Sequence, residues 1–214
     1  MADDGKPRIP RGPNKVRRAA TRAKILDAAV RCLAEFGYAA TSTPLVARLA
    51  KVSRGSLLHQ FPTKVDLILA VAGHAARGQG GFIRDQVMAL PVGRERFVGG
   101  VDAVWAALKR PEAIALSEIT LAARSDPELA ERYPDFADAL EASMHRGRGR
   151  MAEGLGASER AAEVDVLAHM TLAALRGLAM ESVFVGRPTD DAEKVVALLK
   201  QLRERMADEV ATDL

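Results

Sequence analysis

Apolar residues recur at helical spacing in two neighbouring short runs, which predict two helices joined by a tight turn. The first run contains Val46, Ala47 and Ala50, and the second contains Leu57 and Phe61 at positions i and i+4. Two helices of this size joined by a turn of three or four residues form a helix-turn-helix. The second helix of such a motif fits the major groove of DNA.

Polar residues mark where these helices begin. Thr43 is the expected N-cap of the first helix, with Pro44 at the first helical position, and Ser53 can cap the second. Thr63 and Asp66 have the spacing of a capping box, so a further helix is expected to begin there. The region therefore predicts three helix starts in close succession.

The second of these helices is expected to expose side chains that hydrogen-bond to phosphates or base edges: Arg54, Ser56, His59 and Gln60. The charge distribution agrees with this. Residues 1–60 hold 12 Lys and Arg against 4 Asp and Glu, a net +8, whereas the remaining 154 residues hold 19 against 24, a net −5. A basic third beside an acidic remainder favours a DNA-binding head on another body, and an ordinary solvated surface is the alternative.

Residues 1–18 are rich in Pro, Gly and cations, a composition that predicts a flexible basic arm. Two roles remain open for this arm. It either keeps the protein in solution, or it follows DNA phosphates and enters the adjacent minor groove.

The rest of the chain predicts helices and no convincing strand, so the fold class is all-α. Hydrophobic residues make up 48% of the sequence and aromatic residues 4%, with alanine and leucine abundant, which favours helix. A helix starting at residue 64 is expected to kink at Gly78, Gly80 and Gly81. At least five helices should follow, over residues 97–108, 113–123, 126–151 and 158–183, and from 190 onward.

The first third of the chain resembles the tetracycline-repressor-like (TetR) family of bacterial transcription regulators. The resemblance begins with residues 23–29 and residues 36–42, which open and close a first helix. It continues through a series of positions in order: Val46, Ala47, Ala50, Val52, Ser53, Gly55, Leu57, Phe61, Lys64 and Leu67. The other two thirds match only as a variable all-helical body.

The resemblance implies a helix-turn-helix DNA-binding domain at residues 19–66, with the motif at about 43–61, and a helical ligand-binding and dimerisation domain at 67–214. It implies a repressor that binds a palindromic operator as a homodimer and is released by a small-molecule effector. No enzyme activity and no cofactor are expected. The alternative is a helical enzyme or adaptor in which the helix-turn-helix is incidental.

Three positions depart from the family pattern. Lys51 stands where members place Gly in the turn, and Leu58 and Gln60 replace a Tyr and a His that contact the DNA backbone. A left-handed non-Gly residue at the turn costs about 1 kcal/mol. The candidate DNA-binding residues are Thr41, Thr43, Arg54, Gly55, Ser56, Leu58, His59, Gln60 and Lys64.

In the resembled family the last two long helices of each subunit pair across a two-fold axis. The apolar stripes on these helices give the candidate dimer interface: Leu172, Leu175, Leu198, Leu199, Leu202 and Met206. An effector pocket would be lined by apolar and aromatic side chains with a few polar anchors. Its candidates, each of which also suits a plain core, are Trp105, Met144, His145, Met170 and Phe184; an apolar or amphipathic effector is favoured.

Other chemistry finds little support in the sequence. No metal-binding spacing links the four histidines, and no nucleophile-elbow, Walker or zincin motif occurs. The single cysteine, Cys32, excludes an internal disulfide and is expected to be a buried thiol. The N-terminus lacks a secretory pattern and no run of 18 apolar residues occurs, so a cytoplasmic protein without a membrane partner is expected.

Overall fold

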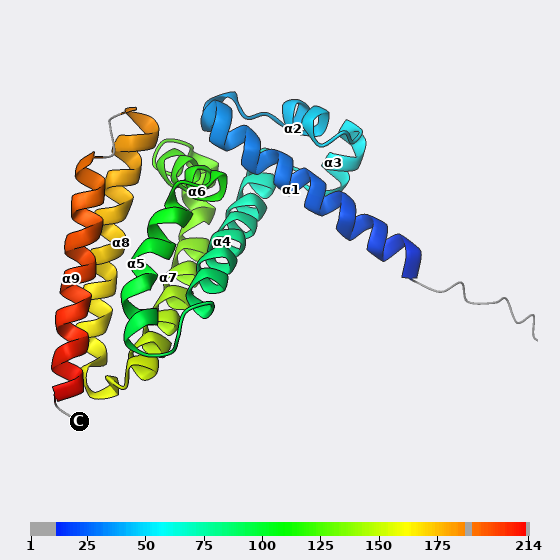
Figure 1. Ribbon diagram of the computed structural model, residues 1–214. Helices are drawn as coiled ribbons and strands as arrows, with labels where there is room; N and C mark the ends of the chain where they lie inside the picture. Colours follow the sequence, from blue (N-terminus) through cyan, green and yellow to red (C-terminus); the bar gives the residue numbers. More distant parts are fainter. Residues whose placement is uncertain (1–11, 187–189, 213–214) are drawn as a thin grey trace, which may run out of the picture.

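The fold is all-α, as the sequence predicted. The computed structural model describes residues 12–186 and 190–212, in which the chain forms nine α-helices and one short 3₁₀ helix (Figure 1). Their bounds are α1 Gly12–Ala40, α2 Thr43–Leu49, α3 Arg54–Gln60, α4 Lys64–Met88, α5 Arg94–Leu108, α6 Pro111–Ala122, α7 Pro127–Leu155, η1 Ser158–Arg160, α8 Ala161–Phe184 and α9 Asp190–Thr212.

Helices α1 to α3 form a small head that shares its core with the start of α4 and with α6. This core fully buries Ile25 of α1, Val46 of α2 and Leu57 of α3. Val65 of α4 is 2% exposed in the same core. Cys32 lies in the same cluster, which confirms the expectation of a buried thiol, and burial raises its pKa. The predicted apolar runs therefore hold α2 and α3 against α1.

The capping residues were predicted correctly at two of three helix starts. The Ser53 hydroxyl accepts a hydrogen bond from the Ser56 backbone N–H, and Thr63 and Asp66 form a complete capping box on α4. The prediction of Thr43 as the cap of α2 was wrong. Ser42 is the cap, with an extended backbone and its hydroxyl facing the Leu45 backbone N–H, because the helix begins one residue earlier than expected.

The expected arm of residues 1–18 needs a correction. Residues 1–11 lie outside the described part of the chain, but α1 begins at Gly12, so residues 12–18 are helical. Pro13 is compatible with this start because the first turn of a helix needs no proline N–H. The residues that follow it are Asn14, Lys15, Val16, Arg17 and Arg18. Lysine and arginine are good helix formers, and they let α1 extend beyond the head.

The glycines of α4 do not interrupt it. Gly78, Gly80 and Gly81 lie inside one continuous helix from Lys64 to Met88, so the expected kink was wrong. Isolated glycines cost helix stability without breaking the hydrogen-bond ladder, and packing against α5 and α6 maintains the helix. As a result α4 runs without a break from the head into the body (Figure 1).

Five helices, α5 to α9, complete the body, as the sequence predicted. Two apolar clusters hold them together. One contains Phe97 of α5 with Val164 of α8 and Val210 of α9, and the other contains Val101 of α5 with Leu175 of α8. Helices α8 and α9 run side by side along the edge of the molecule farthest from the head (Figure 1).

One charged side chain lies deep in this body. Arg203 of α9 is 2% exposed, and its Nη1 donates a hydrogen bond of 2.7 Å to the backbone oxygen of Phe97. No carboxylate pairs with it among the described residues, and its Nε has no partner there. Desolvation lowers the pKa of Arg203 to about 10, so this site disfavours the positive charge.

Over the described residues, no helix has both the length and the apolar character that a membrane crossing would need.

Candidate nucleic-acid interface

Helix α3 presents a polar face to solvent because its other face is anchored in the head. Leu57 is fully buried and Phe61, the C-cap, is 1% exposed. On the outer side Arg54, Gly55 and His59 are exposed. Ser56, Leu58 and Gln60 are half-buried beside them. Of the predicted recognition-helix residues, these three exposed positions are therefore the most accessible to a base edge or phosphate.

The turn before α3 has the backbone that the family pattern requires. Lys51 has a φ of 55°, the left-handed conformation that glycine usually supplies. Its side chain is exposed, as is that of Arg48 in the last turn of α2. Both cations flank α3, and sequence reasoning missed them as contact candidates. Their positions, at the end of α2 and in the turn before α3, could have identified them as contact candidates.

Of the two threonines predicted to contact DNA, one is buried. Thr41 is 1% exposed and its hydroxyl donates a hydrogen bond of 2.7 Å to the backbone oxygen of Gly37. Thr41 therefore stabilises the connection between α1 and α2. Its hydroxyl is buried and cannot reach a phosphate, so the prediction that it contacts DNA was wrong. Thr43, in the first turn of α2, is half-buried.

Lys64, expected to contact phosphate, is instead engaged by the head. Its Nζ donates a hydrogen bond of 3.3 Å to the backbone oxygen of Tyr38 and lies 4.1 Å from the centre of the Tyr38 ring. This is a cation–π arrangement. A phosphate could recruit Lys64 only by drawing its ammonium group away from Tyr38.

Tyr38 also joins the head to the body. Its backbone N–H donates to Glu118 Oε2 of α6 at 2.9 Å, and its phenol donates to Asp126 Oδ2, the N-cap of α7, at 2.5 Å. Burial and the Asp126 carboxylate raise the pKa of the phenol, and the bond from Tyr38 lowers the pKa of Asp126. A displacement of α6 or α7 would therefore strain these two hydrogen bonds at the C-terminal end of α1.

Four of the five candidates for an effector pocket have described side chains, and these differ in their surroundings. Trp105 of α5 is half-buried against the cluster around Val101, and Met144 of α7 is half-buried. His145 is 72% exposed and pairs with Asp165, and Met170 is 45% exposed on α8. The side chain of Phe184 lies outside the described part of the structure. Trp105 therefore packs in the body core and Met170 lines the groove between α8 and α9, and the location of an effector pocket stays a prediction.

The candidate dimer residues divide between two sides of the α8–α9 pair. Leu175 and Leu199 are 0% and 3% exposed in the core of their own subunit, so their assignment to an interface was wrong. Leu198 is 53% exposed, and Leu172, Leu202 and Met206 are half-buried. The two sides of these helices are both apolar, which is why spacing alone did not separate them.

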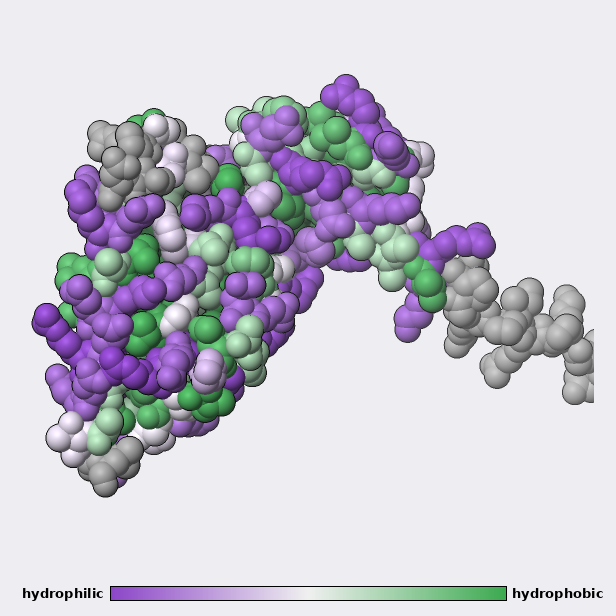
Figure 2. Space-filling model, in the orientation of Figure 1, coloured by the Kyte–Doolittle hydropathy of each residue, from purple (hydrophilic) through white to green (hydrophobic). Residues whose placement is uncertain are grey.

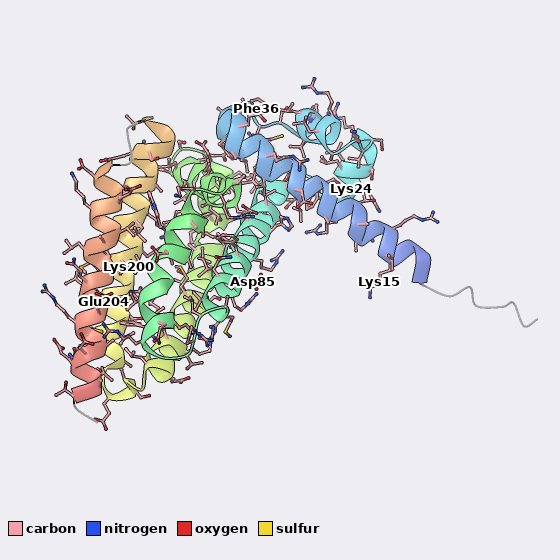
Figure 3. The ribbon with its side chains drawn as sticks, viewed as in Figure 1. Lys15, Lys24, Phe36, Asp85, Lys200 and Glu204 are labelled. Carbon is pink, nitrogen blue, oxygen red and sulfur yellow. The ribbon has the colours of Figure 1, made fainter. Side chains whose placement is uncertain are left out.

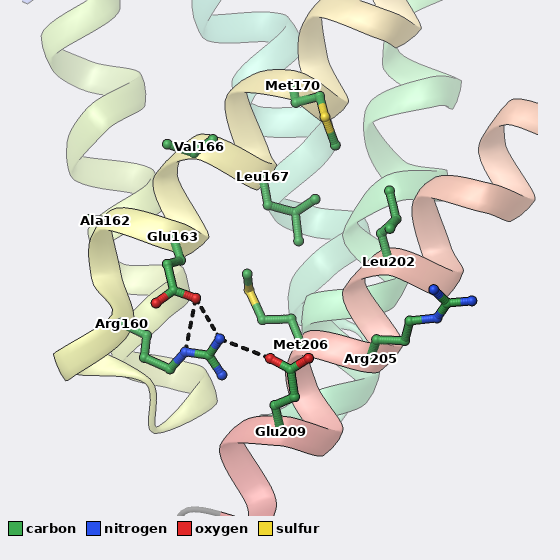
Figure 4. Close-up of a pocket in the computed structure, with 10 residues that line it drawn as sticks. All are labelled: Arg160, Ala162, Glu163, Val166, Leu167, Met170, Leu202, Arg205, Met206 and Glu209. Carbon is green, nitrogen blue, oxygen red and sulfur yellow. Dashed lines mark hydrogen bonds and ion pairs between the residues drawn. The ribbon is translucent and has the colours of Figure 1, made fainter.

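A shallow groove of about 560 Å³ runs between α8 and α9 on the outer side (Figure 4). Leu202 and Met206 line it together with Val166, Leu167 and Met170. At one end Arg160 binds Glu163 of α8 and Glu209 of α9, at 2.5 and 2.9 Å. Figure 2 shows hydrophobic side chains interrupting the hydrophilic surface over these two helices.

These features define a class of protein: a helix-turn-helix head, capped and anchored as a DNA-reading motif, on a helical body. Residues 25–71 match the family model described as bacterial regulatory proteins, tetR family. The chain therefore belongs to the TetR family of bacterial transcriptional regulators.

Relatives agree with this assignment. An uncharacterized HTH-type transcriptional regulator of Mycobacterium tuberculosis is 29% identical over 129 residues, 60% of this chain and 66% of that protein. The chain thus spans about two thirds of that relative's length. The HTH-type transcriptional repressor AcnR of Corynebacterium diphtheriae is 27% identical over 180 residues, 84% of this chain and 90% of AcnR. At family level this supports a regulator and not an enzyme.

Solved structures share the fold. A putative TetR-family transcriptional regulator from a Rhodococcus species has a TM-score of 0.64 at 16% identity, covering 86% of this chain and 99% of that one. A putative transcriptional regulator from Saccharomonospora viridis, in complex with choline, has a TM-score of 0.59 at 17% identity, covering 89% and 96%.

Proposed function

We propose that the chain is a homodimeric repressor that binds a palindromic operator and leaves it when a small-molecule effector binds the helical body. The observation that carries the proposal is the exposure of Arg54 and His59 on α3, whose opposite face is fixed by Leu57. A helix fixed on one face, with exposed polar side chains on the other, can hydrogen-bond to base edges. The relative AcnR is named a repressor. The chain would act in the bacterial cytoplasm, where the operator lies.

Recognition is assigned mainly to α3. Arg54 stands at its N-terminus and can reach a guanine edge or a phosphate, with Gly55, Ser56, His59 and Gln60 along the same helix. A bidentate guanine contact makes Arg54→Ala cost about 1–3 kcal/mol, concentrated at one base position. Arg84→Ala, which removes an exposed cation from the body end of α4, is the matched control and should leave affinity unchanged.

The experiment begins with selection of bound sequences from random duplex DNA by the full chain. A palindromic consensus should emerge, with half-sites one helical turn apart or a multiple of that. Affinity of the wild type, Arg54→Ala and Arg84→Ala proteins is then measured on that consensus and on single-base variants. Failure to enrich any sequence, or equal losses in both variants, would refute the proposal.

Dimerisation is assigned to the outer side of α8 and α9. Val166, Met170, Met180 and Leu198 are between 41% and 68% exposed there, which is unusual for large apolar side chains on one face. Leu202 and Met206 continue this face into the groove. A second copy of the same face would cover it, and two linked heads would gain affinity by binding two half-sites at once.

Effector release is assigned to the route from the body to α4. The effector must favour one spacing of the two heads, since a ligand with equal affinity for both arrangements shifts nothing. Helix α4 and the Tyr38 contacts with Glu118 and Asp126 supply a continuous physical connection. A structural neighbour solved in complex with choline supports small-molecule binding by a protein of this fold, and the aliphatic clusters here favour an apolar or amphipathic effector.

A further inference from the structure

The N-terminal part of α1 extends well beyond the head (Figures 1 and 3). The first buried residue of the helix is Ile25, and of residues 15–24 only Thr21 is even half-buried. Residues 12–24 span about 20 Å at 1.5 Å per residue. Within the described residues no other element covers this projecting part of the helix, so its side chains are available to a partner.

Its charges are of one sign. Residues 12–26 contain five cations and no acidic residue. All five cations are exposed, and no carboxylate pairs with any of them among the described residues. They are Lys15, Arg17, Arg18, Arg22 and Lys24.

Three of these cations continue the face of α1 that is buried farther along. Side chains seven residues apart lie on nearly the same side of a helix. Arg18 stands seven residues before buried Ile25, and Arg22 stands seven before buried Ala29, with Lys15 seven before Arg22. The inward face of α1 thus changes from apolar to cationic where the helix leaves the core.

A contact fixes the direction of this cationic face. The Arg22 guanidinium lies 4.4 Å from the centre of the Phe61 ring, and Phe61 ends α3. Lys15 and Arg18 continue the same side outward from that point. Arg17 and Lys24 lie on the other side of the helix, about 100–180° from the three inward cations at 100° per residue.

The geometry points to a second DNA-contact surface: the Lys15–Arg18–Arg22 face of α1 lies along the phosphate backbone next to the groove that α3 enters. The inference rests on the proposed DNA binding by α3 and adds a contact that α2 and α3 do not provide. From Lys15 to Arg22 this face spans about 10 Å of helix, which passes roughly three phosphates of one strand at 3.4 Å each along the DNA axis. A chain of phosphates fits a charged rod of one sign, whereas a mere solubilising tail needs no preferred face.

The test compares two double variants that remove the same charge from the same helix. Lys15→Ala/Arg18→Ala changes the inward face, and Arg17→Ala/Lys24→Ala changes the outward face. Alanine is the best helix former, so both variants keep α1 helical, which circular dichroism checks. Affinity of the full chain for a random-sequence duplex is measured from 50 to 200 mM salt, and the slope of log K against log salt is compared.

The inward variant should lower the magnitude of the slope by about 1.8 for each bound subunit, 0.9 for each lost phosphate contact. That corresponds to about a twelvefold smaller loss of affinity over this salt range. The outward variant should keep the wild-type slope, and Lys15→Arg/Arg18→Lys should keep it too. Equal slopes in all variants, or equal reductions in both alanine variants, would overturn the inference. A wild-type protein that binds no DNA would instead refute the proposed function.

Discussion

The buried Arg203 gives the sharpest test of the energetics of the body. Its charge is taken out of water, and no carboxylate of the described residues pairs with it. Its Nη1 lies 2.7 Å from the Phe97 backbone oxygen and 3.9 Å from the Met151 sulfur, and the guanidinium lies 5.0 Å from the centre of the Phe97 ring. Arg203→Met keeps a long apolar side chain of adaptable shape and removes the charge. We expect this change to stabilise the protein.

The magnitude follows from the pKa. Burial lowers the pKa of Arg203 well below the ordinary arginine value, to about 10, and each pKa unit corresponds to 1.36 kcal/mol, so burying the charge costs about 3 kcal/mol. The hydrogen bond to Phe97 has a charged donor and returns about 1.5–3 kcal/mol of this cost. The net gain expected from Arg203→Met is therefore between about 0 and 1.5 kcal/mol at pH 7, in line with other replacements of buried charges by apolar residues.

Urea unfolding of wild type and Arg203→Met, followed by circular dichroism, measures the difference. Arg203→Lys is the control, because it keeps the charge and should not stabilise. Gly100→Ala adds a second check: its new methyl group would lie 3.2 Å from Arg203 Nη1, so it should be better tolerated in the Met variant than in wild type. A loss of 2 kcal/mol or more in Arg203→Met would refute the reasoning and show that the guanidinium is a net stabilising element.

Three further changes test the junction, the dimer face and α4. Tyr38→Phe removes the bond to Asp126 and should cost about 1 kcal/mol. Because the pKa of Asp126 is lowered and that of the phenol raised, this contribution should be present between about pH 4 and 10 and lost outside that range; a pH-independent difference between wild type and variant in urea unfolding would contradict it. Leu198→Glu should yield monomers in sedimentation, whereas Leu121→Glu, equally exposed at 52% on α6, should not; a dimeric Leu198→Glu protein would show that another face is used. The methyl group added by Gly80→Ala meets no atom within 4 Å, so this change should raise the stability of the continuous α4 by about 0.5–1 kcal/mol; an unchanged or lower free energy of unfolding in urea would contradict it.

The sequence by itself determined the helix-turn-helix and two of its three helix caps. Periodicity and capping chemistry act over three or four residues. Ser53 and the capping box of Thr63 and Asp66 could therefore be identified as marking helix starts without knowing what the helices contact. The same holds for Lys51, whose left-handed backbone follows from its place in the turn. The charge difference between head and body, and the order of motif residues, likewise indicated the family before any fold was known.

Only the tertiary structure decided which side of an apolar helix faces inward. Helices α8 and α9 are apolar on two sides, and packing against α5 buries Leu175 and Leu199 while leaving Leu198 outside. It also turned Lys64 onto Tyr38, 26 residues away in the chain, a contact that no local pattern contains. Such choices depend on which surfaces distant segments offer one another, because burial and hydrogen bonding are satisfied by the whole fold and not by neighbouring residues.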